Sequence, residues 1–176
     1  MLPRRTRRAC AHCPTVDTVR HIIAILLQNE AGALSRVAGL FSTRGYNIES
    51  LSVAATDDPA VSRLTLVTKG SDAVIQQIAS QLLKLVDVVS VEDLTRGEHV
   101  ERELLLLKIG VRDDARGALE GAVVRAGGRV LSVTGAAHLV ELTSSEAQIN
   151  AFVADAGSYG QILEVVRSGA LGVARK

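Results

Sequence analysis

Hydrophobic and polar residues alternate along the chain in patterns typical first of a strand and then of a helix. Residues 20–28 form an apolar, β-branched run that predicts a buried strand. An amphipathic helix is expected next, because apolar residues at i, i+3, i+4 and i+7 share one face: Leu34, Val37, Ala38 and Phe41. We expect it to end at Gly45, after Arg44, because a cation suits the last turn and glycine suits the C-cap.

The following segment predicts a hairpin, a second helix and a closing strand. Alternating apolar residues indicate a strand at 51–55 and, after a polar turn, another at 64–67. Ser71 suits the N-cap of a helix with the apolar stripe Ile75, Ile78, Ala79 and Leu82. Valines at 88–91 predict the closing strand. The order β-α-β-β-α-β is that of a split ferredoxin-like module.

The second half of the chain repeats this order after a polar stretch at 95–103. Strands are expected at 104–109, 130–133, 138–142 and 162–166. The third helix should end at Gly127-Gly128 and has the apolar stripe Leu119, Ala122, Val123 and Ala126. The fourth helix should begin with a capping box of Thr143 and Glu146, and its apolar stripe is Ile149, Phe152, Val153 and Ala156. The repeat indicates two copies of one module.

We therefore predict an α+β protein with tandem ferredoxin-like βαββαβ modules. The expected boundaries are a first module at 20–95, a linker at 96–102 and a second module at 103–176. Each sheet would carry helices on one face only, so its other face and its edge strands need cover. Self-association supplies that cover, and we expect at least a homodimer.

Composition narrows the possible partners. The chain is 47% hydrophobic and 22% charged, as is typical of globular proteins. No apolar stretch approaches the roughly 20 residues that a membrane span needs, so we expect a cytoplasmic protein with no membrane partner. Aromatic residues make up 2% of the chain, too few for stacking on single-stranded nucleic acid. Five arginines fall within residues 1–20, which leaves the remainder mildly acidic and argues against DNA binding.

Residues 1–19 differ from the rest of the chain because they are arginine-rich and show no apolar periodicity. They lack the apolar core of a secretory signal, so we expect a disordered leader or a misassigned translation start. Cys10 and Cys13 are the only cysteines in the sequence. A zinc site of this kind needs a second ligand pair, so neither a metal site nor a disulfide is expected.

The sequence offers no constellation of catalytic residues. None of the four histidines lies in an HExxH motif, and the chain has neither a nucleophile elbow nor a phosphate-binding glycine loop. The carboxylate pairs Asp57-Asp58 and Asp113-Asp114 fall in a turn and at a helix start, where solvated or capping roles are expected. We therefore expect no catalytic site, no metal and no cofactor in this chain.

The segment between the first strand and the first helix, residues 29–35 (NEAGALS), is the strongest candidate for ligand binding. A plain turn with a helix cap is the alternative interpretation. Backbone N–H groups at a helix start favour an anion, and Gly32 has no side chain to obstruct one. The amide of Asn29 can accept from an ammonium and donate to a carboxylate. Asn47, beside the apolar Ile48, adds a second amide, so the two segments together suit a small zwitterion.

A family resemblance sharpens this hypothesis. The run NEAGALSRVAGLFSTRGYNIESLSVAATDDPAVSRLTLVT (29–68) resembles the signature of the small regulatory subunits of acetolactate (acetohydroxyacid) synthase, as do KLVDVVSVEDL, GEHVERELLLLKI and ILEVVRSGALGVARK. The resemblance implies an N-terminal ACT domain and a C-terminal ACT-like domain without catalysis of their own. It also implies a catalytic large subunit as partner, carrying thiamine diphosphate, Mg²⁺ and FAD. Feedback inhibition by valine, in branched-chain amino acid biosynthesis, is implied as well.

The resemblance also implies a set of site residues. The family's valine site maps onto Asn29, Ala31, Gly32 and Ala33 of one protomer and onto Asn47 and Ile48 of a neighbouring protomer. The second module has Arg112 where the first has Gln28-Asn29, so no site is expected there. Valine, leucine and isoleucine all remain candidate effectors, because one methylene is worth only about 1–3 kcal/mol in an apolar pocket.

Two other classes of protein compete with this interpretation. An amino-acid-responsive transcription regulator would need a helix-turn-helix segment, which residues 1–19 cannot hold. A self-contained enzyme would need a catalytic constellation, and the sequence offers none.

Overall fold

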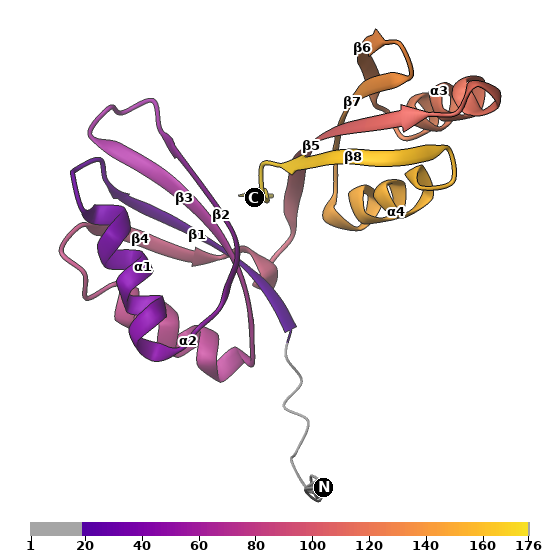
Figure 1. Cartoon of the computed structure of the whole chain (residues 1–176). Coiled ribbons are helices and arrows are strands. Elements are labelled where there is room, and N and C mark those ends of the chain that lie inside the picture. Colours follow the sequence, from indigo (N-terminus) through magenta and orange to yellow (C-terminus); the bar gives the residue numbers. More distant parts are fainter. Residues whose placement is uncertain (1–18, 176) are drawn as a thin grey trace, which may run out of the picture.

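The computed structural model describes residues 19–175, which form two antiparallel sheets that each carry two helices (Figure 1). The predicted α+β class and the tandem ferredoxin-like βαββαβ modules are confirmed. The predictions for residues 1–18, including Cys10 and Cys13, fall outside the described residues. Within 19–175, no helix is long and apolar enough to cross a membrane.

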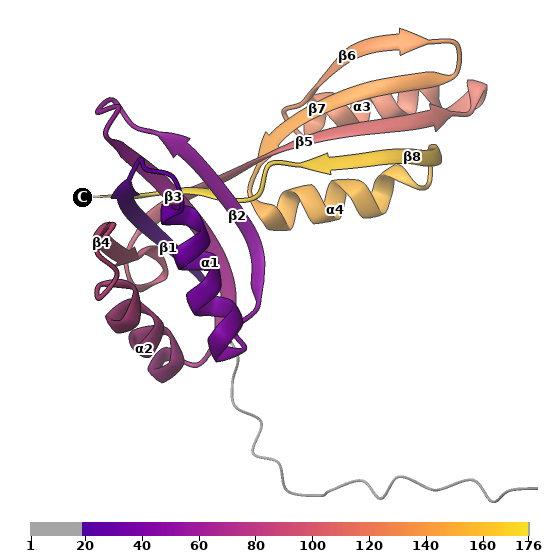
Figure 2. The same cartoon turned by 60° about the vertical axis from the view of Figure 1, so that its left-hand side comes forward.

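The first module has its helices on one face of the sheet, as the turned view in Figure 2 shows. Its strands lie in the order β2-β3-β1-β4. The elements are β1 (Val19–Gln28), α1 (Ala33–Arg44), β2 (Ile48–Ala55), β3 (Val61–Gly70), α2 (Asp72–Leu82) and β4 (Val88–Asp93). Strand β2 is therefore one edge of this sheet, and β4 is the other.

The second module repeats this plan with the order β6-β7-β5-β8. A 3-10 turn, η1 (Leu94–Arg96), leads into it, and a second one, η2 (Asp113–Ala115), precedes its first helix. The other elements are β5 (His99–Val111), α3 (Arg116–Arg125), β6 (Arg129–Thr134), β7 (Ala137–Ser144), α4 (Glu146–Ala156), β8 (Gly160–Arg167) and β9 (Leu171–Ala174).

Each module has its own aliphatic core between the sheet and its helices. In the first, alternate residues of β1 meet buried residues of both helices: Ile23, Ile25, Leu27, Ala33, Val37, Phe41, Ile75, Ile78 and Leu82. The predicted stripe of α1 is wrong at its start, because Leu34 is 40% exposed while Ala33 is 1% exposed. The helix begins at Ala33, so its buried positions fall at i, i+4 and i+8 from that residue.

The structure specifies the secondary structure at two places for which the sequence led to an expectation. The stretch expected to be a linker, 96–102, consists of the end of η1 and the start of β5. Strand β9 explains this conformation, since it pairs with β5 from His99 to Arg102 and satisfies backbone groups that a linker would leave in water. The predicted capping box of Thr143 and Glu146 is wrong: Ser145 is the N-cap of α4, and its side chain accepts from the backbone N–H of Gln148.

Strand β9 also lies against the face of the first sheet that the helices leave open. On this face Leu94, from η1, and Ala170, just before β9, pack on Ile22, Ala24 and Val67 of the first sheet. Arg63 donates to the carbonyl of Gly172 at 2.8 Å. The second module thus covers part of the open face of the first sheet. An ion pair of Arg20 with Glu101 joins the two modules near the start of β1, whereas the loop before α1 follows the other end of that strand.

Candidate functional site

The candidate site begins with the loop between β1 and α1, residues 29–32. All four residues are exposed, and Gly32 has φ of 90°, a left-handed conformation that glycine adopts without steric cost. Gly32 is the N-cap of α1 and so provides no side chain to cap the helix. Ala33 is buried in the core, and its N–H donates to the carbonyl of Glu30 at 3.2 Å. Ala33 therefore anchors the helix start and does not expose its side chain.

Asn29 ties this loop to the turn between β2 and β3. Its backbone N–H donates to the carbonyl of Ala60 at 2.8 Å, and its Nδ2 donates to the carbonyl of Pro59 at 3.0 Å. The side-chain oxygen Oδ1 receives no hydrogen bond from another described residue. Asn29 therefore presents an acceptor to solvent from a fixed position.

Asn47 and Ile48 lie at the other end of α1. That helix is 12 residues long, which corresponds to about 18 Å. The side chain of Asn47 is exposed, while its carbonyl accepts from Thr68 Oγ1 at 2.6 Å; Ile48 is half-buried against the first core. One chain therefore does not bring Asn47 and Ile48 to Asn29, so a joint site would require a second copy.

The structure adds two residues that the sequence-based argument did not single out, Arg36 and Asp87. Arg36, on α1, donates from Nε and Nη2 to the two carboxylate oxygens of Asp87, with an Nη2–Oδ1 distance of 2.7 Å. The Asp87 side chain is 5% exposed. Its charge inside the apolar run LVDVV was the available sequence signal, because buried carboxylates are usually paired.

Asp87 holds both ends of the loop. Its carbonyl accepts from the N–H of Gln28 at 2.8 Å, while its carboxylate binds Arg36 beyond the other end of the loop. The hydrogen bond from Arg36 lowers the pKa of Asp87, and Asp87 raises the pKa of Arg36 in turn. Both groups are therefore ionised at neutral pH.

The start of α1 is electropositive. Its first turn contains no acidic residue, and the N–H groups of Leu34 and Ser35 have no acceptor among the described residues. A helix start with unpaired N–H groups carries a partial positive charge, to which the Arg36 guanidinium adds. The site can therefore attract a carboxylate, while Asn29 Oδ1 suits an ammonium.

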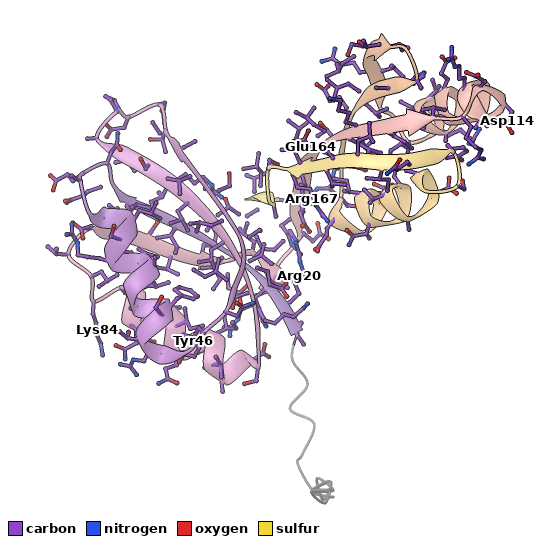
Figure 3. All side chains as sticks on the ribbon, viewed as in Figure 1. Arg20, Tyr46, Lys84, Asp114, Glu164 and Arg167 are labelled. Atoms are coloured by element: carbon purple, nitrogen blue, oxygen red, sulfur yellow. The ribbon has the colours of Figure 1, made fainter. Side chains whose placement is uncertain are left out.

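A hollow lined by several charged residues lies elsewhere, between the two modules, with a volume of about 370 Å³. Figure 3 shows Arg20 and Arg167 in this region. Arg20 pairs with Glu101 and Glu146, each at 2.5 Å, and Arg167 pairs with Glu103 at 2.5 Å. These charges satisfy one another, so we assign this hollow a structural role.

Comparisons with known proteins find similarity to one family, the acetolactate synthase small subunits, across most of the chain. Residues 23–90 match the family model for the AHAS small subunit-like ACT domain, and residues 102–176 match that for the small subunit of acetolactate synthase. The chain is 46% identical to the acetolactate synthase isozyme 3 small subunit of Escherichia coli K12, over 89% of this chain and 96% of that protein. It is 41% identical to the acetolactate synthase small subunit of Haemophilus influenzae, over the same shares.

A solved structure gives the same result. The acetolactate synthase small subunit from Thermotoga maritima superposes with a TM-score of 0.81 at 31% identity, covering 90% of this chain and 98% of that one. The similarity thus extends over both modules and is not confined to the shared ferredoxin-like fold. This chain belongs to the family of acetolactate synthase small subunits.

Proposed function

We propose that this chain binds the catalytic large subunit of acetolactate synthase, activates it and makes it sensitive to feedback inhibition by valine. Membership of the family supports binding to the large subunit, because such chains are regulatory subunits and the catalytic function lies in the large subunit. On this proposal the large subunit holds thiamine diphosphate, Mg²⁺ and FAD, and the assembly acts in the cytoplasm in branched-chain amino acid biosynthesis.

The loop at 29–32 is the single observation that best supports effector binding by the first module. It is exposed, it opens onto the start of α1, and Asp87 fixes both of its ends. We propose that Gly32 and Ala31 let the effector approach the helix start and that Asn29 receives its ammonium group. On this assignment residues 20–95 form the effector module, 96–102 join it to the next, and 103–176 form the second module.

We propose that Asn47 and Ile48 complete the site from the neighbouring protomer of a homodimer. The edge strand β2 supports this arrangement, because Leu51 and Val53 on it are 36% and 41% exposed. An edge strand with exposed apolar side chains is a surface on which a second copy can pack. Such a contact would bring two copies of α1 and β2 together.

Reconstitution with the large subunit tests the regulatory role. The chain alone should form no acetolactate from pyruvate, the mixture should be faster than the large subunit alone, and valine should slow the mixture. Turnover by the purified chain alone would contradict the proposal, as would a mixture no faster than the large subunit.

Substitutions at the two amides test the site. Asn29→Ala and Asn47→Ala each remove a hydrogen bond to a charged group of the effector, worth roughly 1.5–3 kcal/mol. The apparent affinity for valine should fall about tenfold to a hundredfold, while activation of the large subunit persists. If both variants fold and respond to valine like the wild type, the site lies elsewhere.

A further inference from the structure

We infer that Arg36 is a further effector-binding residue, whose Nη1 takes the α-carboxylate of the bound amino acid while Asp87 orients the guanidinium. This inference rests on the proposed effector site and assigns one of its contacts. On this assignment Arg36 binds the carboxylate of the ligand and Asn29 binds its ammonium group.

The geometry of the ion pair leaves one guanidinium nitrogen available. Asp87 accepts from Nε and from Nη2 of Arg36, and no described residue accepts from Nη1. A Cβ built at position 32 would lie 3.1 Å from Nη1, so this nitrogen is next to Gly32. The unused donor therefore faces the loop in which the effector is expected to bind.

The ion pair also fixes the position of this donor. Asp87 is buried and is bonded through its carbonyl to Gln28, so the guanidinium is held relative to both ends of the loop. The Arg36 side chain itself remains 45% exposed, which leaves it accessible to a ligand. A charged donor held in place before binding loses less entropy on binding than a mobile one.

The other candidate donor in the loop is partly committed. Asn29 donates from Nδ2 to Pro59, and its Oδ1 is suited to an ammonium group. The remaining donors near Gly32 are the N–H groups of Leu34 and Ser35 and Nη1 of Arg36. The nearby negative charge of Glu30 also raises the pKa of Arg36. No hydrogen bond joins the two side chains, so Glu30 leaves Nη1 of Arg36 available.

A ligand-by-residue cycle tests the assignment in the reconstituted holoenzyme. L-valine and L-valinamide, which lacks the carboxylate, are compared as inhibitors of complexes with wild-type chain and with Arg36→Gln. Loss of a hydrogen bond to a charged group should weaken inhibition by valine about tenfold to a hundredfold. Inhibition by valinamide should change by less than about threefold, so Arg36→Gln should lose most of the wild-type preference for valine.

Three further variants separate binding from folding. Arg167→Gln is the matched control, because Glu103 holds Arg167 in a similar ion pair in the second module, and it should keep the preference for valine. Asp87→Asn keeps the cation but removes its anchor, so its preference should fall between those of wild type and Arg36→Gln. Arg36→Met removes the charge but keeps an unbranched apolar side chain, and it decides the question if Arg36→Gln does not fold.

The outcomes are distinct for the inference and for the function on which it rests. If folded Arg36→Gln, or Arg36→Met in its place, prefers valine over valinamide as strongly as the wild type does, Arg36 does not bind the carboxylate. If the preference is lost in Arg167→Gln as well, the effect is not specific to the loop and the inference also fails. If valine does not inhibit the wild-type holoenzyme, the proposed function fails instead.

Discussion

Gly32 shows how one residue can set the properties of the site. Its positive φ is unfavourable for other residues by roughly 1–2 kcal/mol, and a side chain there would meet the Arg36 guanidinium. Glycine thus serves both the turn into α1 and the approach of a ligand. A substitution at this position should affect the response to the effector more than the fold, because the residue is exposed.

Gly32→Asp should abolish inhibition by valine. Its carboxylate would pair with Nη1 of Arg36 and occupy the place of the effector's own carboxylate. Gly117→Asp is a control, because Gly117 lies in the first turn of α3 in the second module and a Cβ there meets nothing within 4 Å. Inhibition curves of reconstituted holoenzyme provide the measurement. A normal valine response of folded Gly32→Asp would show that the effector binds elsewhere.

The pair of Asp87 and Arg36 should make stability depend on pH in acid. The hydrogen bond from Arg36 lowers the pKa of Asp87 below 3.8, so the folded protein releases that proton more readily than the unfolded chain. The resulting stabilisation is present above pH 3.8 and is lost as the pH falls through the lower, folded-state pKa. The deficit of Asp87→Asn in urea unfolding should therefore be larger at pH 6 than at pH 3. An equal deficit at both values would contradict this account.

At the scale of elements, apolar periodicity predicted most of the fold. The stripes of α2, α3 and α4 are buried at most of their predicted positions, because each helix presents one continuous face to its sheet. The exception, Leu34 in α1, followed from the helix start at Ala33, which depends on the conformation of Gly32. Local pattern thus predicts that a helix exists better than it predicts which residue begins it.

Elements whose stability comes from distant partners were not predictable in this way. Strand β9 is only four residues long and alternates between exposed and half-buried positions, and it owes its conformation to pairing with the start of β5. The sequence alone, without that partner, predicts a polar linker at 96–102. The charge of Asp87 within an apolar run indicates that this carboxylate has a partner, but Arg36 is 51 residues away, so no local pattern identifies it as that partner. The loop of the candidate site was predictable from sequence, whereas the pair that holds it was not.

Gly172 on β9 should be sensitive to bulk. A Cβ there would lie 2.6 Å from Leu94 and 3.4 Å from Ile22, both of which are buried. Gly172→Val should therefore lower the free energy of unfolding by about 1–3 kcal/mol through overpacking. Gly97→Val is the control, since a Cβ at Gly97 meets nothing within 4 Å, and should cost less than about 0.5 kcal/mol. Equal effects in thermal unfolding would show that β9 does not pack closely on the first sheet.

At the scale of the whole molecule, the separation of the two halves of the site makes the oligomer part of the function. Asn29 and Asn47 lie at opposite ends of α1, so one chain can supply only half of the proposed clamp. If two copies complete it, the effector binds the dimer more tightly than the monomer. By linkage, the effector must then stabilise the dimer as much as dimerisation strengthens binding.

A positive charge introduced by substitution on the edge strand β2 should therefore weaken both dimerisation and valine binding. Val53→Lys places a cation on the exposed apolar edge, where two copies would bring like charges together. Val89→Lys, on the other edge strand β4, where Val89 is 58% exposed, should leave both properties unchanged. Sedimentation velocity with and without valine measures the shift: valine should lower the dimer dissociation constant of the wild type, and Val53→Lys should raise it. A monomer that binds valine as tightly as the dimer would show that the site is complete within one chain.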